Sequence, residues 1–148
     1  AQEKLFPLPE SWVLTPHAGE LARILNIDSR EINNDRYRYA LEASRKAGCH
    51  VLLKGYRSIL AFGERTLVIQ SGNAALAKAG TGDVLTGMIG GFLAQDLPTV
   101  QATATAAYLH GRMSDEWVRS GSDKRSLMAS DIGQHLPQLM NRIANGTF

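Results

Sequence analysis

The chain alternates between short continuous runs of apolar residues and longer stretches in which apolar residues recur at helical spacing. Short apolar or β-branched runs are typical of buried strands, whereas recurrence every three or four positions predicts an amphipathic helix. The predicted strands cover residues 12–15, 51–55, 58–63 and 66–71. The predicted helices cover residues 17–25, 28–46, 82–95, 100–121 and 130–146. Strands that alternate with helices in this order predict a layered α/β domain.

Residues with special backbone preferences mark the ends of the first two helices. Thr15 can cap the first helix with its hydroxyl, and Pro16 suits the first helical turn. Asp28 and Glu31 have the spacing of a capping box at the start of the second helix, and Gly48 follows its end. We therefore expect one continuous helix between these two signals.

The C-terminal half is predicted to be helical apart from its turns. Ser130 can cap the last helix, in which Pro137 predicts a late start or a kink. The GMIGG stretch at residues 87–91 predicts close packing between helices. The small-residue packing face expected on the long helix consists of Val100, Ala104, Ala107, Tyr108 and Gly111.

Composition places the chain among single-domain globular proteins. Its 148 residues are 44% apolar and 20% charged, with a net charge of +2 and no long charged block. These values favour neither a nucleic-acid partner nor a membrane partner, and no apolar run is long enough to span a bilayer. Cys49 is the single cysteine, which excludes an intrachain disulfide and fits a cytoplasmic location.

The first residues do not resemble a targeting segment. AQEKLFPLPESW lacks the basic start and apolar core of a signal peptide. The chain opens on Ala1 and not on methionine, so we expect a processed product or a piece of a longer protein.

The strongest chemical signal is AGTGDVLTG at residues 79–87. Gly80 and Gly82 let the backbone approach a ligand closely, and the helix that follows presents free N–H groups and its positive dipole end. Together these features suit a phosphate. Asp83 stands where a carboxylate could take a proton from a hydroxyl that attacks this phosphate. The alternative is a glycine turn in which Asp83 only starts a helix.

Two further motifs have both a chemical and a structural interpretation. KGYRS at residues 54–58 ends a predicted buried strand, where open α/β sheets bind ligands, or it is a hairpin turn with a solvated lysine. In TPHAGE, His17 could touch a polar substrate and Glu20 could order water around Mg²⁺, or both merely begin a helix. His50, His110 and His135 show no ligand spacing, so we interpret them as surface or internally hydrogen-bonded residues.

Three motifs in order carry a specific resemblance. TPHAGE, then KG followed by Ser58, then NAALAKAGTGDVLTGMIGG resemble the C-terminal part of the NAD(P)H-hydrate dehydratases, which belong to the ribokinase-like superfamily. The resemblance implies a ribokinase-like layered α/β/α domain, of which residues 1–148 are the C-terminal portion. It also implies that hydrated NADH or NADPH is repaired with ADP or ATP and Mg²⁺: the ring hydroxyl is phosphorylated, and phosphate then leaves.

The resemblance also implies a role for each matching residue. Asp83 is the base and contacts the hydrated cofactor, His17 contacts the same substrate, and Glu20 matches an acidic position linked to Mg²⁺. The implied nucleotide-binding residues are Lys54, Gly55, Tyr56, Arg57, Ser58, Gly80, Thr81 and Gly82. We also expect a homo-oligomer.

The chain departs from the family in sequence and in length. Ala79, Lys78, Ser58 and Ala18 replace residues that are more usual in the motifs, and these changes leave the chemistry in place. The family's domain begins well upstream of TPHAGE, and its missing half carries central strands and part of the substrate pocket. Bacterial members are often fused upstream to an epimerase domain.

Two alternatives to the dehydratase stay open on the sequence. A ribokinase-like kinase of a small molecule such as a vitamin precursor would use AGTGD and KG equally, although TPHAGE argues against it. A nucleotide-binding module without catalytic activity would need only the glycine turn and the helix start.

Overall fold

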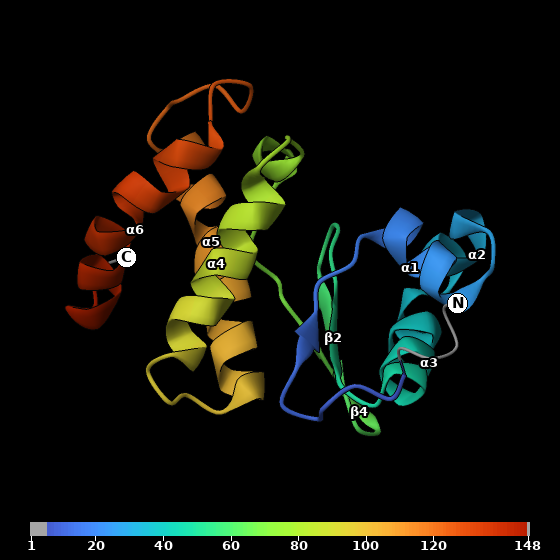
Figure 1. Ribbon diagram of the computed structural model, residues 1–148. Helices are drawn as coiled ribbons and strands as arrows, with labels where there is room; N and C mark the ends of the chain where they lie inside the picture. Colours follow the sequence, from blue (N-terminus) through green and yellow to red (C-terminus); the bar gives the residue numbers. More distant parts are fainter. Residues whose placement is uncertain (1–5, 148) are drawn as a thin grey trace.

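The computed structural model describes residues 6–147, so residues 1–5, on which the signal-peptide interpretation partly rests, lie outside the described residues. Helices cover both faces of a central sheet (Figure 1). The elements are β1 (Val13–Leu14), α1 (Ala18–Leu25), α2 (Ser29–Asn34), α3 (Arg36–Ala47), β2 (His50–Leu53), β3 (Ile59–Phe62), β4 (Arg65–Val68), the 3₁₀ turn η2 (Ala74–Leu76), α4 (Thr81–Leu93), α5 (Thr99–Arg119) and α6 (Ala129–Ala144). This arrangement confirms the predicted α/β/α layering.

The sheet has four strands in the order β1-β2-β3-β4. β1 and β2 are parallel, and the pairs β2–β3 and β3–β4 are antiparallel. The short connections from β2 to β3 and from β3 to β4 explain why these pairs are antiparallel, because a hairpin joins antiparallel neighbours whereas a parallel pair needs a crossover. The crossover from β1 to β2 consists of α1, α2 and α3. All four predicted strands are confirmed.

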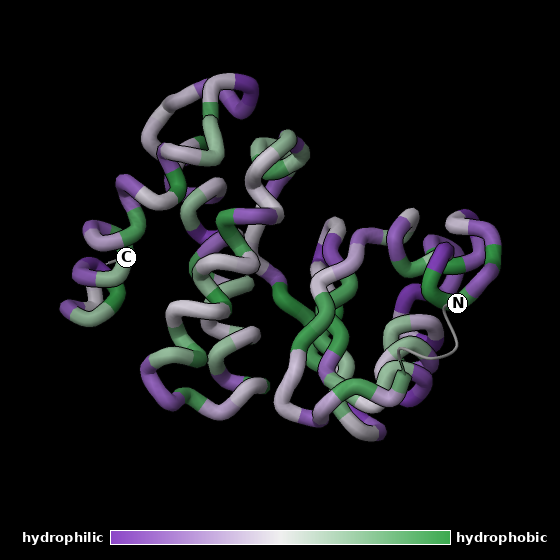
Figure 2. Tube along the Cα trace, viewed as in Figure 1, coloured by the Kyte–Doolittle hydropathy of each residue, from purple (hydrophilic) through white to green (hydrophobic). Residues whose placement is uncertain are grey.

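Alternation along the central strands divides the core between the two faces of the sheet. Val51 and Leu53 face α1–α3, whereas Leu52 between them packs with Leu85 and Ile89 of α4. Successive side chains of a strand point to opposite faces, so a continuous apolar strand fills both cores. Figure 2 shows hydrophobic positions along the strands and hydrophilic positions at the outer turns. A third cluster joins α6 to α4 and α5.

The structure corrects several predicted helix ends. The helix expected over residues 28–46 is two helices, because Asp35 leaves helical geometry at φ −143° and ψ 73° and caps α3 with its side chain. The cap of α1 is His17, and the hydroxyl of Thr15 lies 3.3 Å from that of Thr86. The last helix begins at Ala129, so Ser130 lies within its first turn.

Two packing predictions also change, and one of the two alternatives for Pro137 is excluded. Pro137 lies inside α6, so it does not delay the start of that helix. Tyr108 is 41% exposed and does not belong to a buried face of α5. In the GMIGG stretch, a β-carbon at Gly87, Gly90 or Gly91 would meet no described atom within 4 Å, so these glycines do not provide close helix contacts. Within residues 6–147, no helix combines the length and the apolar content needed to cross a bilayer.

Candidate functional site

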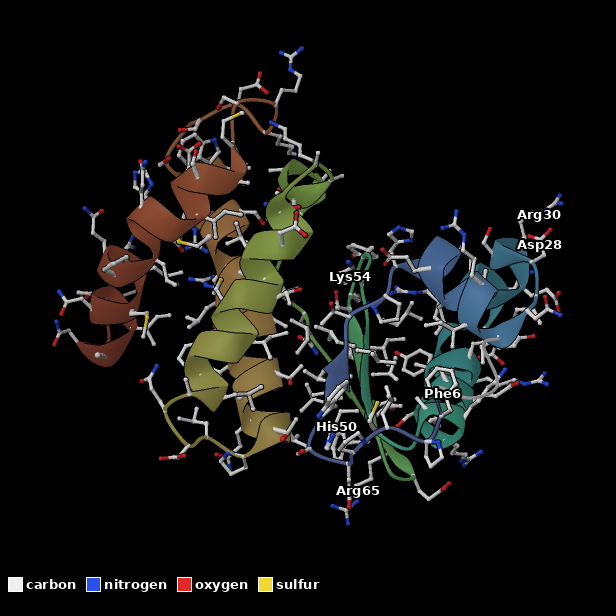
Figure 3. All side chains as sticks on the ribbon, viewed as in Figure 1. Phe6, Asp28, Arg30, His50, Lys54 and Arg65 are labelled. Carbon is white, nitrogen blue, oxygen red and sulfur yellow. The ribbon has the colours of Figure 1, made fainter. Side chains whose placement is uncertain are left out.

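The parallel register of β1 and β2 brings two of the motifs side by side. Val13 pairs with His50, and the same register continues past the strands to a bridge between His17 and Lys54. The N–H of Lys54 donates to the carbonyl of Pro16 at 2.8 Å. TPHAGE and KGYRS therefore meet at the carboxyl end of both strands, and Figure 3 shows Lys54 there between α1 and α4. This edge is where open α/β sheets bind ligands.

His17 and Glu20 form a capping box at the start of α1. The N–H of His17 donates to Oε2 of Glu20 at 2.7 Å, and the N–H of Glu20 donates to Nδ1 of His17 at 3.2 Å. Because Nδ1 accepts, Nε2 carries the proton of the neutral imidazole. The His17 N–H lowers the pKa of the Glu20 carboxyl, as does the ammonium of Lys54 at 3.7 Å. Both side chains are solvent-exposed.

The start of α4 presents unused backbone donors. Gly80 precedes the helix in the left-handed region at φ 84°, where glycine is unstrained, and no side chain caps this end. Within residues 6–147, the N–H groups of residues 81–83 have no hydrogen-bond acceptor, whereas Val84 donates to the Gly80 carbonyl at 3.1 Å. A helix that starts this way attracts an anion through both its N–H groups and its dipole.

Lys54 closes this corner from the side of the sheet. A β-carbon at Gly82 would lie 3.2 Å from its Nζ, so the ammonium stands directly against the first turn of α4. KGYRS is a hairpin turn between the antiparallel strands β2 and β3, as the alternative interpretation had it. Its lysine is not solvated, however, because the side chain of Lys54 is only 24% exposed. An ammonium beside free amide donors is a chemical match for a phosphate group.

A cavity of about 360 Å³ extends from this corner between the sheet and α5. Its volume falls in the range of roughly 300–1,000 Å³ that is usual for small-molecule sites. The residues of KGYRS and Thr81 and Gly82 line one end. The apolar remainder is lined by Ile69, Leu76, Ala77, Leu85 and Ala107, together with Gly111. A polar end next to an apolar slot suits a ligand with a charged tail and a flat ring.

The wall opposite KGYRS depends on Asp115 and Ser114, which the sequence analysis did not single out, and on Gly111, which it placed on a packing face. Asp115 accepts from the N–H of Gly72 at 2.9 Å and from the amide of Asn73 at 3.0 Å. Ser114 accepts from the N–H of Asn73 at 3.1 Å. A β-carbon on Gly111 would lie 2.6 Å from the carbonyl oxygen of Ser71, so only glycine allows this approach. Gly111, Ser114 and Asp115 share one face of α5. The sequence pattern gave the packing role of Gly111, but it does not indicate which loop the two polar residues reach.

His110 is buried behind the start of α4. Its Nε2 lies 2.9 Å from the Thr81 carbonyl, which can only accept, so Nε2 donates. Burial lowers the pKa of this histidine and keeps the ring neutral. The single hydroxyl proton of Thr81 is shared within the same turn between the carbonyls of Leu76 at 2.8 Å and Lys78 at 2.9 Å. The turn before α4 is therefore held from several sides, and His110 is an internally hydrogen-bonded histidine as interpreted.

The structure places the expected site residues in two groups. Lys54 to Ser58, Thr81 and Gly82 line the cavity. Asp83 is exposed in the first turn of α4, next to Gly82, and does not line the cavity. His17 and Glu20 both lie next to Lys54, the first through a backbone bridge and the second through its carboxylate. Gly80 is the N-cap residue of α4. Lys78, two residues before Gly80, does not point to the start of α4. Its Nζ instead donates to the carbonyl of Leu127 at 2.7 Å.

The ligand sets that hold metal ions in proteins are commonly groups of histidine, cysteine, aspartate or glutamate side chains. No group of three or more histidine, cysteine, aspartate or glutamate side chains able to hold a metal occurs within residues 6–147. Glu20 is engaged by the N–H of His17 and by Lys54. Mg²⁺ commonly keeps its waters and binds through substrate phosphates with one or two carboxylates. A magnesium ion here would therefore depend mainly on the phosphates of a bound nucleotide.

Comparison with known proteins agrees with this geometry. The model of the NAD(P)H-hydrate dehydratase family matches residues 1–138. The bifunctional NAD(P)H-hydrate repair enzyme Nnr of Moorella thermoacetica is 40% identical over 132 residues, which is 88% of this chain and 25% of that protein. The structure of the ADP/ATP-dependent NAD(P)H-hydrate dehydratase from Bacillus subtilis, co-crystallised with ATP and Mg²⁺, is 35% identical and superposes with a TM-score of 0.84.

A ribokinase-like superfamily protein of Enterococcus faecalis superposes with a TM-score of 0.81 at 30% identity, over 95% of this chain and 48% of that one. The Bacillus structure is covered to 47%, against 88% of this chain. The chain thus spans about half the length of these solved structures, and its layered fold is ribokinase-like. From the family match and the shared fold, this chain belongs to the NAD(P)H-hydrate dehydratase family.

Proposed function

We propose that this chain supplies the nucleotide-binding half of an enzyme that dehydrates hydrated NADH or NADPH at the expense of ADP or ATP. In this proposal residues 1–148 are the C-terminal portion of one ribokinase-like domain. The observation that carries it is the corner where the ammonium of Lys54 stands against the free N–H groups of α4, at the mouth of a cavity lined by the KGYRS residues.

The nucleotide lies in the cavity with its phosphates toward α4. The apolar slot holds the adenine ring, and Lys54 to Ser58 flank the ribose and phosphates. The terminal phosphate accepts hydrogen bonds from the amides of Gly82 and Asp83, and Lys54 neutralises part of its charge. Gly80 and Thr81 set the turn that aims these amides.

Asp83 acts as the base at this terminal phosphate. Its exposed carboxylate takes the proton of the ring hydroxyl as the oxygen attacks phosphorus, and AMP or ADP leaves. The phosphate then departs from the ring carbon while the neighbouring carbon loses a proton, which restores the double bond. In this proposal the exposed ring of His17, beside Lys54, contacts the polar part of the substrate.

Magnesium bound with the nucleotide would offset the charge of the phosphates. Glu20 is the side chain that would hold one of its waters in this proposal. The family relatives include a bifunctional repair enzyme, and we propose the same kind of upstream epimerase fusion here. We further propose a cytoplasmic location and a homo-oligomer.

The test measures NADH absorbance and inorganic phosphate in the full-length protein that carries this chain. With hydrated NADH and ADP or ATP present, both should rise together, and neither should rise when the hydrate or the nucleotide is left out. A stable phosphorylated product in place of NADH would identify the small-molecule kinase alternative. Nucleotide binding without any turnover would identify a non-catalytic module.

A further inference from the structure

Arg36 reaches from the start of α3 to the KGYRS loop on the far side of the sheet from the cavity. Its guanidinium donates to three backbone carbonyls of the segment: that of Leu53 at 3.2 Å, that of Tyr56, and that of Arg57 at 3.5 Å. A β-carbon on Gly55 would lie 2.8 Å from its Nη2, so the loop packs directly on the guanidinium. The side chain of Arg36 thus contacts the KGYRS loop from Gly55 to Arg57.

Arg36 makes these contacts without a carboxylate partner among residues 6–147. The group is partly buried, and burial lowers the pKa of the guanidinium. Other arginines of the chain, such as Arg30 and Arg45, pair with acidic residues. The described partners of the Arg36 guanidinium are therefore backbone carbonyls of Leu53 and of the loop.

The carbonyl contacts also decide where the loop's amides point. In a planar trans peptide, the C=O and the following N–H point in opposite directions. Because the Tyr56 carbonyl is turned to Arg36, the N–H of Arg57 is turned away from Arg36. Tyr56 and Arg57 are both among the residues that line the cavity. The N–H of Arg57 has no acceptor within the described part of the chain. Arg57 is in the left-handed region at φ 53°, which is uncommon for a non-glycine residue.

We propose that Arg36 is a positioning residue of the nucleotide site. It acts through the loop: its planar fork holds the Tyr56–Arg57 peptide so that the N–H of Arg57 meets an oxygen of the bound nucleotide, either of the phosphate or of the ribose. This inference rests on the proposed function, because it needs a nucleotide in the cavity. It adds a residue from α3, outside the three sequence motifs, that makes no contact with the ligand itself.

The test compares Arg36→Lys and Arg36→Met with the unmodified chain. Lysine keeps the charge but lacks the planar fork with several donors, and methionine removes both. The control is Arg38→Met, an exposed position on the same helix. Circular dichroism first establishes the temperature range in which each variant is folded. Within it, calorimetry measures the Kd for ADP, and hydrogen exchange reports on the amides of residues 55–58.

Both Arg36 variants should weaken ADP binding by tenfold or more and speed exchange in residues 55–58, while Arg38→Met leaves both unchanged. Full binding by Arg36→Lys alone would show that only the charge matters and would overturn the positioning role. Equal binding and exchange in all variants would overturn the inference entirely. If the unmodified chain bound no ADP, the proposed function would fail with it, whereas the exchange data would still decide whether Arg36 holds the loop.

Discussion

Replacing Gly82 with alanine should strengthen the fold and weaken nucleotide binding at the same time. Gly82 lies in the first turn of α4 and is not among the glycines with positive φ, so alanine fits its backbone. Alanine is favoured over glycine in a helix by up to about 1 kcal/mol. In a domain of this size that corresponds to a rise in Tm of about 2–4 °C.

The binding loss follows from the position of Lys54. A β-carbon at residue 82 would lie 3.2 Å from its Nζ, and the flexible lysine can give by a few tenths of an ångström. The new methyl group therefore causes no collapse of the fold, but it takes the space between the ammonium and the free amides where we place the phosphate. Losing one hydrogen bond to a charged group costs about 1.5–3 kcal/mol. We expect the Kd for ADP to rise by about tenfold or more.

The assay pairs thermal unfolding with calorimetric titration of ADP. The matched control is Gly91→Ala, in the same helix, where an added β-carbon meets no described atom within 4 Å. It should raise Tm by a similar amount and leave the Kd unchanged. Gly82→Ala that binds ADP as tightly as the unmodified chain would refute a phosphate site between Lys54 and α4.

Three further variants address the base, the buried histidine and the far wall of the cavity. Asp83→Asn should bind ADP almost normally yet lower turnover in the full-length protein by roughly a hundredfold or more, the scale for a lost general base; unchanged phosphate release would remove Asp83 from the mechanism. Burial lowers the pKa of His110 in the folded state, so below about pH 6.5 the unfolded chain takes up a proton at this histidine before the folded chain does. The free energy of unfolding therefore has its full value above about pH 6.5 and falls as the pH drops toward the folded pKa. His110→Gln should flatten this part of the stability profile in urea unfolding, and an unaltered slope would argue against a neutral buried ring. Asp115→Asn places an amide where two donors need an acceptor and should cost about 1–3 kcal/mol in the same assay, with Asp96→Asn on the surface as control. Equal stability of the two variants would contradict the anchoring of residues 72–73.

Much of the fold followed from local patterns. Continuous apolar runs predicted the strands because a strand with cores on both sides needs apolar residues at every position, as Val51, Leu52 and Leu53 show. Helix ends were less predictable. Asp35 breaks the helix expected over residues 28–46. Arg36 and Tyr37 directly after it continue the helical pattern of polar and apolar residues, so the pattern alone shows no break. A cap on α3 competes there with helix continuation, and the sequence pattern does not decide between them.

The position of the KGYRS loop was predictable, because the loop follows a buried strand and so lies at the carboxyl edge of the sheet. The KGYRS loop and the start of α4 lie together because both occupy the carboxyl edge of the sheet. Arg36 and Asp115 were not predictable, because each acts on a loop more than fifteen residues away in sequence. Their side chains look like those of any solvated helix face until the tertiary contacts are known. Periodicity reports which face of a helix is apolar, but it does not report which distant backbone a polar residue will reach.

The most direct test of the account is a crystal structure of this chain with bound ADP. We predict the terminal phosphate within hydrogen-bond distance of the amides of Gly82 and Asp83 and of the Lys54 ammonium, with the adenine between Ile69 and Ala107. Density for the nucleotide away from this corner, or phosphates that bypass the first turn of α4, would contradict the account.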